Sequence, residues 1–271
     1  MKQFSAHYPV WFCDIWGVIH DGYAPIMGTC AALAKHRSQG GIVILVTNSP
    51  RTAQGVDQQL REIGVQQNAY DAIVTSGDVT RTLMVEHGGG KIFHLGPKRD
   101  ISIFSGLKLK QVELAEATSV LCTGLFEERE ETPADYLPLL SEIKERGLTF
   151  ICANPDKIVR KGAELIYCAG ALGEEFTKLG GDVLMAGKPF APIYELAVTA
   201  AEKLRGGVVS KDDILAIGDG PETDIRGASD FGLPCVLITG GINSGEDVLA
   251  SVQNAVPRAR ILAAMAELDW L

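Results

Sequence analysis

Short apolar runs alternate with amphipathic stretches along most of this chain. The runs that we expect to be strands include VWFCDIW, IVILVT and AIVTSG (residues 10–16, 42–47 and 72–77). The stretches between them that have helical periodicity and end at glycine are residues 29–40, 52–64 and 78–90. A strand that is apolar on both faces must be covered on both, and helices that alternate with such strands provide that cover. The alternation therefore predicts an α/β fold with a doubly wound parallel sheet.

The alternation changes at a run of three glycines, residues 88–90, and returns to its first form near residue 183. The elements expected between these points are strands at 91–96, 119–124 and 148–156 and a helix at 133–147. The elements expected afterwards are helices at 191–206, 222–232 and 258–271 and strands at 213–220 and 233–239. A chain of 271 residues suits one domain with a sizeable insertion. We predict a core of residues 1–88 and 183–271 and an inserted, smaller α/β domain of residues 89–182.

Net charge and apolar content narrow the classes of function. The formal net charge of -9 argues against a nucleic-acid-binding protein, because phosphate backbones select positive surfaces. The N-terminal residues lack the apolar core of a signal peptide, and no stretch approaches the roughly 18 apolar residues of a membrane span. The six cysteines form no C-x-x-C pair, which favours reduced core thiols. We therefore expect a cytoplasmic protein that binds neither membranes nor nucleic acid.

Polar residues stand where the expected strands end. Asp14 closes the first strand, Thr47, Asn48, Ser49 and Arg51 follow the second, and Asp219 and Asp224 follow the strand at 213–220. Lys188 precedes the helix at 191–206. Ligands of open parallel sheets bind at the carboxyl ends of the strands, so these side chains are expected to meet at one site.

Each of these residue types has a role in phosphoryl transfer. Asp14 can attack phosphorus and form an acyl phosphate. Asp14 and Asp219 can hold Mg²⁺, a hard cation that prefers oxygen ligands. Lys188 supplies positive charge beside the nucleophile, and Asp224 can orient Lys188 or a metal-bound water. The hydroxyl and amide groups after the second strand can donate to phosphate oxygens.

Four motifs in this order, CDIWGV, LVTNSPR, AGKP and IGDGPETDI, resemble those of the haloacid dehalogenase superfamily. The place of the insertion, after the third strand and before the motif lysine, resembles class IIA. That class contains sugar-phosphate, nucleotide and pyridoxal-phosphate phosphatases with an α/β cap. The resemblance implies a magnesium-dependent phosphomonoesterase that acts on a small phosphorylated metabolite, in which the cap selects the substrate and can form a homodimer. It also implies that Asp14, the backbone carbonyl of Trp16 and Asp219 bind the metal.

Trp16 departs from the pattern of these phosphatases, which usually carry a second aspartate two residues after the nucleophile. That aspartate protonates the leaving alcohol and then activates water, and an indole can do neither at neutral pH. His20 and Asp21 follow the strand and are the candidates to replace it. The predicted site therefore comprises the catalytic residues Asp14, Lys188, His20 and Asp21, the substrate-binding residues Trp16, Thr47, Asn48, Ser49, Arg51 and Asn154, and the metal-binding residues Asp14, Trp16, Asp219 and Asp224.

Trp16 also keeps two other functions open. The chain could bind a phosphorylated metabolite with little or no turnover, or it could be a 2-haloacid dehalogenase, which needs no metal. Asp219, Asp224 and the class IIA type of insertion speak against the dehalogenase. Asn154 has an alternative of its own, because the sequence NPDK is also typical of an ordinary Asx turn.

Overall fold

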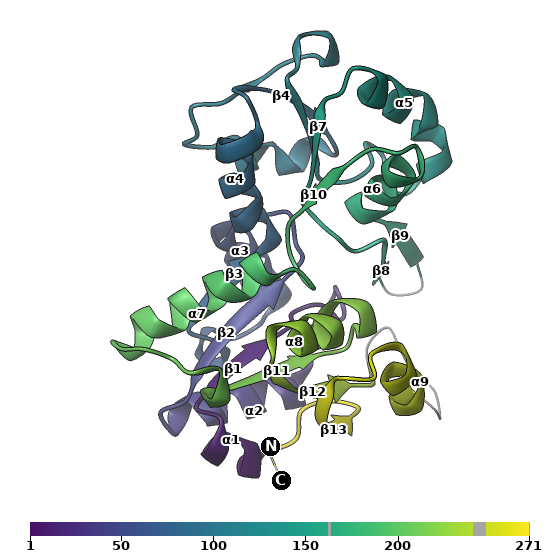
Figure 1. The fold of residues 1–271 in the computed structure, drawn as a ribbon. Coiled ribbons are helices and arrows are strands. Elements are labelled where there is room, and N and C mark those ends of the chain that lie inside the picture. Colours follow the sequence, from purple (N-terminus) through teal and green to yellow (C-terminus); the bar gives the residue numbers. More distant parts are fainter. Residues whose placement is uncertain (162–163, 241–247, 271) are drawn as a thin grey trace. The chain divides into compact units, whose positions relative to one another are not determined.

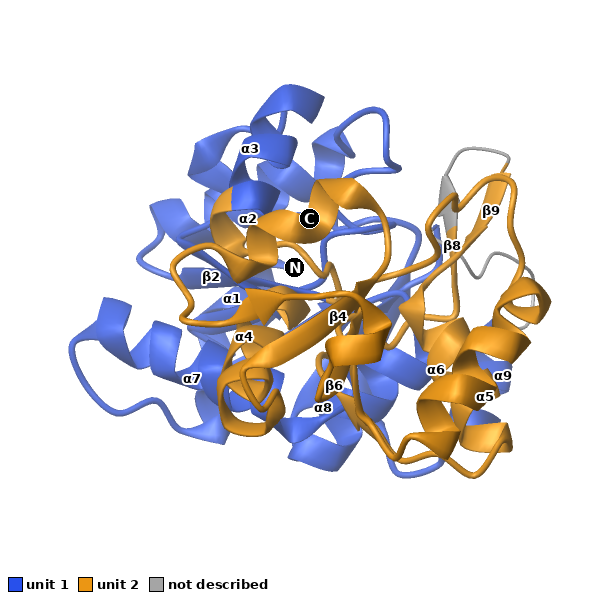
Figure 2. Ribbon diagram, turned by 90° about the horizontal axis from the view of Figure 1, so that it is seen from above, with its two compact units in different colours: residues 1–47, 55–74, 188–271 blue, residues 48–54, 75–187 orange. Residues whose placement is uncertain are grey.

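A computed structural model describes residues 1–161, 164–240 and 248–270 (Figure 1). The chain forms two compact units (Figure 2). Unit 1 contains residues 1–47, 55–74 and 188–271, and unit 2 contains residues 48–54 and 75–187. Most of unit 2 is therefore one continuous segment between two parts of unit 1. That the two units act as a catalytic core and a cap remains a prediction.

Unit 1 is built on a six-stranded sheet with the order β13-β12-β11-β1-β2-β3. Its strands are β1 (Val10–Cys13), β2 (Ile42–Thr47), β3 (Ala72–Thr75), β11 (Ile214–Gly218), β12 (Pro234–Ile238) and β13 (Arg260–Met265). The pairs β1–β2, β1–β11, β11–β12 and β12–β13 are parallel. Every residue of β1, β11 and β12 is buried, as expected for strands that are covered on both faces.

Helices cover both faces of this sheet. They are α1 (Lys2–His7), α2 (Met27–Ser38), α3 (Ala53–Ile63), α7 (Ala191–Arg205), α8 (Arg226–Phe231) and α9 (Val248–Ala255). Trp11 of β1 shares a core cluster with Leu33 of α2 and Leu60 of α3. Phe12, the next residue of β1, lies on the opposite face with Tyr194 of α7. The predicted α/β fold with a doubly wound parallel sheet is confirmed.

The C-terminal segment differs from its prediction. Residues 258–271 were expected to form a helix, but Arg260–Met265 form strand β13 at the edge of the sheet. Ala263 and Ala264 pair with Val236 and Leu237 of β12, and the register shifts between Cys235 and Val236. Alanine has the highest helix propensity, but propensity is a weak determinant, and the backbone hydrogen bonds that the open edge of β12 offers outweigh it.

Unit 2 has its own parallel sheet, with the order β10-β7-β6-β4-β5. Its strands are β4 (Lys91–Leu95), β5 (Lys110–Gln111), β6 (Ser119–Cys122), β7 (Thr149–Cys152) and β10 (Val183–Met185), and a separate hairpin consists of β8 (Ile158–Lys161) and β9 (Glu164–Tyr167). Its helices are α4 (Ser76–His87), α5 (Leu137–Glu145) and α6 (Ala169–Lys178). Phe150 of β7 stacks on Phe176 of α6 at a centroid distance of 4.7 Å in the core. Within the described part of the chain, no helix is both long and apolar enough to span a membrane.

Candidate functional site

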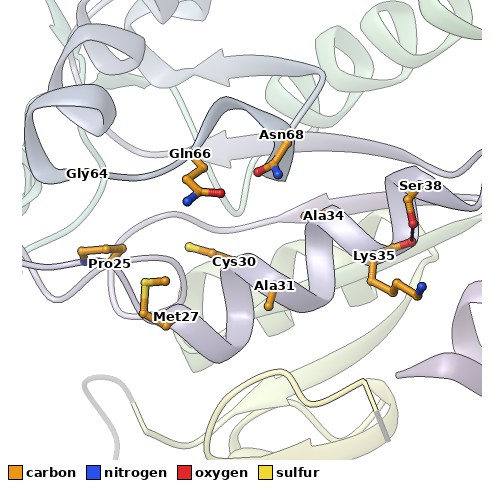
Figure 3. A pocket seen from close by; sticks show the side chains of 10 residues that line it. All are labelled: Pro25, Met27, Cys30, Ala31, Ala34, Lys35, Ser38, Gly64, Gln66 and Asn68. Carbon is orange, nitrogen blue, oxygen red and sulfur yellow. Dashed lines mark hydrogen bonds between the residues drawn. The ribbon is translucent and has the colours of Figure 1, made fainter.

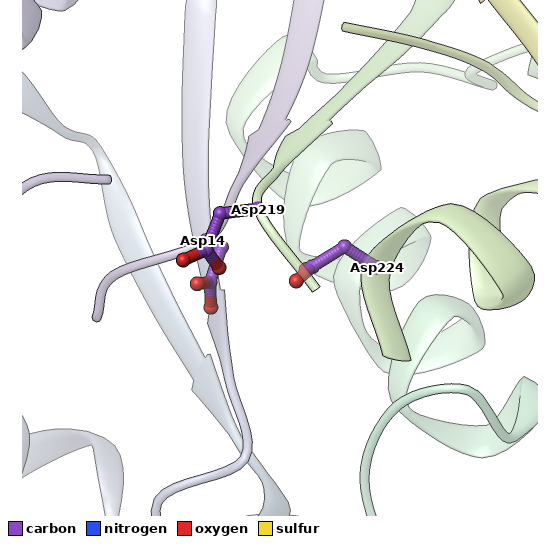
Figure 4. Close-up of side chains that lie close together, drawn as sticks. All are labelled: Asp14, Asp219 and Asp224. Carbon is purple, nitrogen blue, oxygen red and sulfur yellow. The ribbon is translucent and has the colours of Figure 1, made fainter. Parts of the chain in front are cut away.

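Three carboxylates meet at the carboxyl ends of neighbouring strands in unit 1. Asp14 follows β1, Asp219 follows β11, and Cys13 pairs with Ile217 in the register that aligns the two strand ends. Asp224 lies in a π-helical turn, Pro221–Ile225, directly after β11. One oxygen atom from each of the three carboxylates lies within 4.8 Å of the others, and all three residues are buried (Figure 4). The parallel sheet therefore assembles an oxygen-rich cluster from segments about 200 residues apart.

Lys188 binds two of these carboxylates. Its Nζ donates to Asp14 Oδ1 at 2.5 Å, to Asp224 Oδ1 at 2.7 Å and to the Val46 carbonyl oxygen at 3.0 Å. An ammonium group has three donors, so these bonds use all of them and fix its position. Only 3% of the residue is exposed, which places its charge in a site where electrostatic effects are strong.

The pKa values of Asp14 and Lys188 are shifted because the cluster is buried and because two carboxylates, those of Asp14 and Asp224, pair with the one lysine. Burial, together with the negative charge of Asp224, raises the pKa of Asp14 well above its ordinary value, although Lys188 opposes the shift. Burial disfavours the charged form of Lys188, but Asp14 and Asp224 outweigh it and hold the pKa of Lys188 well above its ordinary value. The lysine therefore stays cationic, and the cluster holds more negative charge than Lys188 alone neutralises.

Two glycines allow Asp224 to approach the end of β11. A Cβ atom on Gly218 would lie 2.2 Å from Asp224 Cγ, and a Cβ on Gly220 would lie 3.0 Å from Asp224 Oδ2. The backbone N–H of Gly220 donates to Asp224 Oδ2 at 3.1 Å, which orients the carboxylate. Glycine is thus needed at positions 218 and 220, because a larger residue there would crowd the carboxylate of Asp224.

The remaining predicted residues divide between the units. Thr47 is the last residue of β2 in unit 1 and is buried. Asn48 begins unit 2, where its side-chain nitrogen donates to Asp156 Oδ1 at 2.8 Å. Asn154 Oδ1 accepts from the backbone N–H of Asp156 at 3.0 Å, which is the hydrogen bond of an Asx turn. The turn alternative for Asn154 is therefore present, and the same turn places Asp156 against Asn48.

Asp156 was not singled out from the sequence, although the NPD motif contains it. Its contact with Asn48 joins positions 108 residues apart, which no local pattern reveals. Ser49 and Arg51 lie in the same unit, where Ser49 Oγ accepts from the Arg51 backbone N–H at 3.3 Å and the Ser49 carbonyl accepts from Gly77 at 3.0 Å. The segment after β2 is thus held in place by hydrogen bonds to its own unit.

Trp16 lies in a tight loop that follows β1. The loop turns at Gly17, whose φ of 80° favours glycine, and the Gly17 N–H donates to the His20 carbonyl at 2.9 Å. The half-buried Trp16 ring contacts the His20 ring edge-to-face at a centroid distance of 5.0 Å. His20 is only 1% exposed, and its Nδ1 accepts from the Gly22 N–H at 2.9 Å.

Neither residue proposed to replace the missing acid is protonated at neutral pH. Burial lowers the pKa of His20 to about 4. Asp21 is exposed, and the backbone N–H groups of Ala24 and Tyr23 lower its pKa, so that it remains a carboxylate. His20 can still donate its Nε2 proton, but as a neutral imidazole, which is a much weaker acid than imidazolium. Their roles as catalysts remain predictions.

The lowered pKa of His20 predicts a loss of stability in acid. The unfolded chain binds a proton near pH 6.5 whereas the folded chain does not until about pH 4, so stability falls as the pH decreases below about 6.5. Between pH 7 and 5 the loss due to His20 is about 2 kcal/mol. In urea unfolding, His20→Gln should reduce the difference in the free energy of unfolding between pH 7 and pH 5 by this amount. The same change at an exposed histidine, His7→Gln, should not reduce it. Equal pH dependence of His20→Gln and wild type would contradict the lowered pKa.

Unit 1 also has an open pocket of about 390 Å³ away from these residues (Figure 3). It lies along one side of α2, facing the segment that follows α3, and its lining includes Met27, Cys30, Lys35 and Gln66. None of the predicted site residues lines it. It contains no pair of carboxylates and no lysine–carboxylate cluster, so it does not compete with the strand-end site as a centre of catalysis.

Comparisons with known proteins agree with the strand-end motifs. A haloacid dehalogenase-like hydrolase model matches residues 11–110, and a HAD-hydrolase-like model matches residues 185–268. The crystal structure of a haloacid dehalogenase-like hydrolase from Brucella suis 1330 is 46% identical, with a TM-score of 0.91 over 99% of this chain and 98% of that one. An acid sugar phosphatase from Staphylococcus aureus is 26% identical over 92% of this chain and 91% of its own length.

A further solved structure extends the likeness in fold. Glycerol phosphate phosphatase from Mycobacterium tuberculosis, in complex with magnesium, has a TM-score of 0.72 and 23% identity over 97% of this chain and 76% of that one. At this identity the likeness concerns the fold. From the family models, the nearly full-length match at 46% identity and the α/β unit inserted in the sequence of unit 1, we conclude that the chain belongs to the haloacid dehalogenase superfamily of hydrolases, class IIA.

Proposed function

We propose that the chain is a magnesium-dependent phosphatase that hydrolyses a small phosphomonoester, such as a sugar phosphate or a nucleotide, through an aspartyl phosphate on Asp14. The observation that carries the proposal is the buried cluster in which Lys188 joins Asp14 and Asp224 beside Asp219. A phosphatase needs a nucleophile, positive charge and oxygen ligands together, and the cluster provides all three. The acid sugar phosphatase relative supports the same class of reaction.

The donor set fits a magnesium ion. Its ligand atoms are carboxylate oxygens that lie within 4.8 Å of one another, and the pKa of Asp14 is raised by burial and, in addition, by the negative charge of Asp224. Asp14, Asp219 and the backbone carbonyl of Trp16 would hold the ion, and Asp224 would support them from beside Lys188. When bound, the ion would supply positive charge that offsets the repulsion between the nucleophile and the phosphate.

The proposed hydrolysis has two steps, formation of the acyl phosphate on Asp14 and its hydrolysis by water. A carboxylate oxygen of Asp14 attacks phosphorus, and the bond from phosphorus to the ester oxygen breaks as the acyl phosphate forms. The leaving alcohol takes up one proton. Water then attacks phosphorus, and the Asp14 carboxylate, inorganic phosphate and a proton are released. Lys188 holds Asp14 in position and stabilises the negative charge that develops on the phosphoryl oxygens, to which Thr47 can donate.

Substrate selection belongs to unit 2 in this proposal. Asn48, Ser49, Arg51 and Asn154, together with Trp16 of unit 1, would contact the substrate. Arg51 is suited to an anionic or carboxylate-bearing substrate, because a guanidinium binds such groups through paired hydrogen bonds. We also propose a homodimer through unit 2, which the resemblance to class IIA implies, and a cytoplasmic location.

Removal of divalent metal is expected to stop the reaction. Phosphate release from a panel of phosphomonoesters, measured with magnesium and then with excess EDTA, should fall to the uncatalysed level and return when magnesium is restored. Asp219→Asn should raise the magnesium concentration needed for half-maximal rate, because it replaces a charged ligand by a neutral one. Turnover that survives chelation would contradict the proposal, and halide release from a 2-haloacid under EDTA would identify a dehalogenase instead.

One observation favours a second candidate function. Trp16 stands where a general acid is expected, and the chain could therefore bind a phosphorylated metabolite without hydrolysing it. Such a protein would be stabilised against heat by the metabolite and magnesium, with phosphate release no faster than for Asp14→Asn.

A further inference from the structure

The pocket along α2 in unit 1 is hollow because small residues line both of its walls (Figure 3). One wall is a face of α2 whose residues follow one another at helical spacing, namely Met27, Cys30, Ala31, Ala34, Lys35 and Ser38. The other wall includes Gly64, which follows α3 with a φ of 99°, a conformation that side chains rarely adopt. A Cβ atom on Gly64 would meet nothing within 4 Å. The glycine that ends α3 therefore leaves space in this wall that no side chain fills.

Hydrogen bonds hold the two walls of the pocket together. Arg37 of α2 donates to the Gln67 carbonyl oxygen at 3.1 Å and to Asp71 Oδ1 at 2.6 Å. These bonds fix the segment that contains Gln66 and Asn68, which line the second wall, against the helix. Small-molecule sites are usually largely pre-formed, and the pocket volume of about 390 Å³ lies in the range of such sites. The pocket therefore has the size and the fixed walls of a ligand site.

The lining is apolar at one end of the pocket and cationic at the other. Pro25, Met27 and Cys30 lie at the apolar end (Figure 3). Lys35 lies eight residues further along α2 than Met27, which is about 12 Å by the rise of an α-helix. It is the only charged residue among the described residues of the lining, and its ammonium group forms no ion pair with any residue that the structure describes. The pocket thus matches a molecule with an apolar chain and an anionic end.

We propose that this pocket is a second small-molecule site of unit 1 and that it binds an amphiphilic anion, a linear carboxylate. The chain lies between Met27 and Ala34, the carboxylate pairs with Lys35, and the side-chain amides of Gln66 and Asn68 can donate to it. The apolar area that the chain buries supplies most of the affinity, because an exposed ion pair contributes little, and Lys35 selects the sign of the charge. The site shares no residue with the strand-end cluster, so the proposal does not depend on the proposed function.

NMR titration of the full chain with linear carboxylates of four to ten carbons tests this proposal. The buffer contains no metal, so that no bound ion attracts anions to the strand-end site, and the primary alcohol and alkylammonium of each length are the controls. The backbone amides of Ala31, Ala34 and Gly64 should shift and saturate. Each added methylene should tighten binding by about two- to fourfold until the chain spans the pocket. The carboxylate should bind about threefold or more tighter than the alkylammonium of equal length.

Two substitutions separate the effect of the charge from that of the hollow. Lys35→Gln should remove the preference for the carboxylate and leave binding of the alcohol unchanged. Lys203→Gln makes the same chemical change at an exposed position of α7 and should keep the preference. Ala34→Leu places a larger side chain in the pocket at a half-exposed position, so the chain should still fold, and the carboxylate and the alcohol should both bind more weakly.

Three results of the titration would overturn the proposal. They are the absence of a saturable shift at these amides for every chain length, an alkylammonium that binds as tightly as the carboxylate, and a preference that survives Lys35→Gln. Amide shifts at Ala31 and Ala34 that depend on protein concentration without any probe would assign the pocket to a second copy of the chain, which would overturn it as well. Absence of phosphate release would refute only the proposed function, because the titration does not depend on turnover.

Discussion

Asp14→Asn is expected to abolish phosphate release and, at the same time, to make the chain harder to unfold in the absence of metal. The amide cannot attack phosphorus, so the rate should fall by at least about 10³-fold, as is usual when a covalent nucleophile is lost. Lys188 keeps Asp224 and the Val46 carbonyl as partners at 2.7 and 3.0 Å, so the substitution does not leave it without acceptors. Malachite-green phosphate assays and urea unfolding with EDTA measure the two effects.

The gain in stability follows from the sign of the pKa shift of Asp14. Burial and Asp224 raise this pKa in the folded chain, so folding favours the protonated form. The contribution of Asp14 to stability is therefore full below its unfolded pKa and is lost as the pH rises through the folded value. Ionisation of Asp14 is therefore a cost to the folded apo chain, and removal of the carboxylate should stabilise that chain.

A matched substitution separates this effect from a general one. Asp230→Asn makes the same chemical change at an exposed position of unit 1 and should alter neither the rate nor the stability. An Asp14→Asn chain that releases phosphate as fast as wild type would remove Asp14 from the reaction. Lower stability of Asp14→Asn in EDTA would mean instead that the ion pair with Lys188 outweighs the cost of burying the carboxylate.

The sequence predicts those parts of the site that depend on strand ends. Asp14 and Asp219 were expected to lie together because β1 and β11 are parallel and buried, and their registers align the two ends. The close approach of Asp224 to Gly218 and Gly220 agrees with the GDG motif, since glycine is what a packed turn permits there. Structural features that depend on residues close together in the sequence can thus be predicted from the sequence.

Contacts set by tertiary packing could not be predicted in this way. The hydrogen bond between Asn48 and Asp156, for example, depends on how one unit packs. The low pKa of His20 is likewise a result of burial, which its polar neighbours in the sequence, HDG, do not suggest. The alanine-rich C-terminal segment favoured a helix until the open edge of β12 offered it a partner.

Trp16→Asp is expected to raise the rate of phosphate release. It places a carboxyl group two residues after the nucleophile, where related phosphatases carry the residue that protonates the leaving alcohol. General acid–base catalysis contributes about 10²–10⁴-fold in well-tuned sites. Because nothing else in this site is adjusted to a second aspartate, we expect a gain at or below the lower limit of that range, about 10- to 100-fold in kcat, for esters of aliphatic alcohols.

The choice of substrate and control makes this prediction specific. In Trp16→Asn the new side chain is similar in size to that of Trp16→Asp, and the same edge-to-face contact with His20 is lost. Because an amide cannot supply a proton, Trp16→Asn should show no gain in the rate of phosphate release. 4-Nitrophenyl phosphate has a leaving group that needs no protonation, and Trp16→Asp should accelerate its hydrolysis much less than that of an alkyl phosphate. Equal rates for Trp16→Asp and Trp16→Asn on the alkyl ester would mean that proton transfer is not what limits this chain. The protein would then already have an acid that acts in place of the missing aspartate, and His20 would be the first residue to substitute in the Trp16→Asn background.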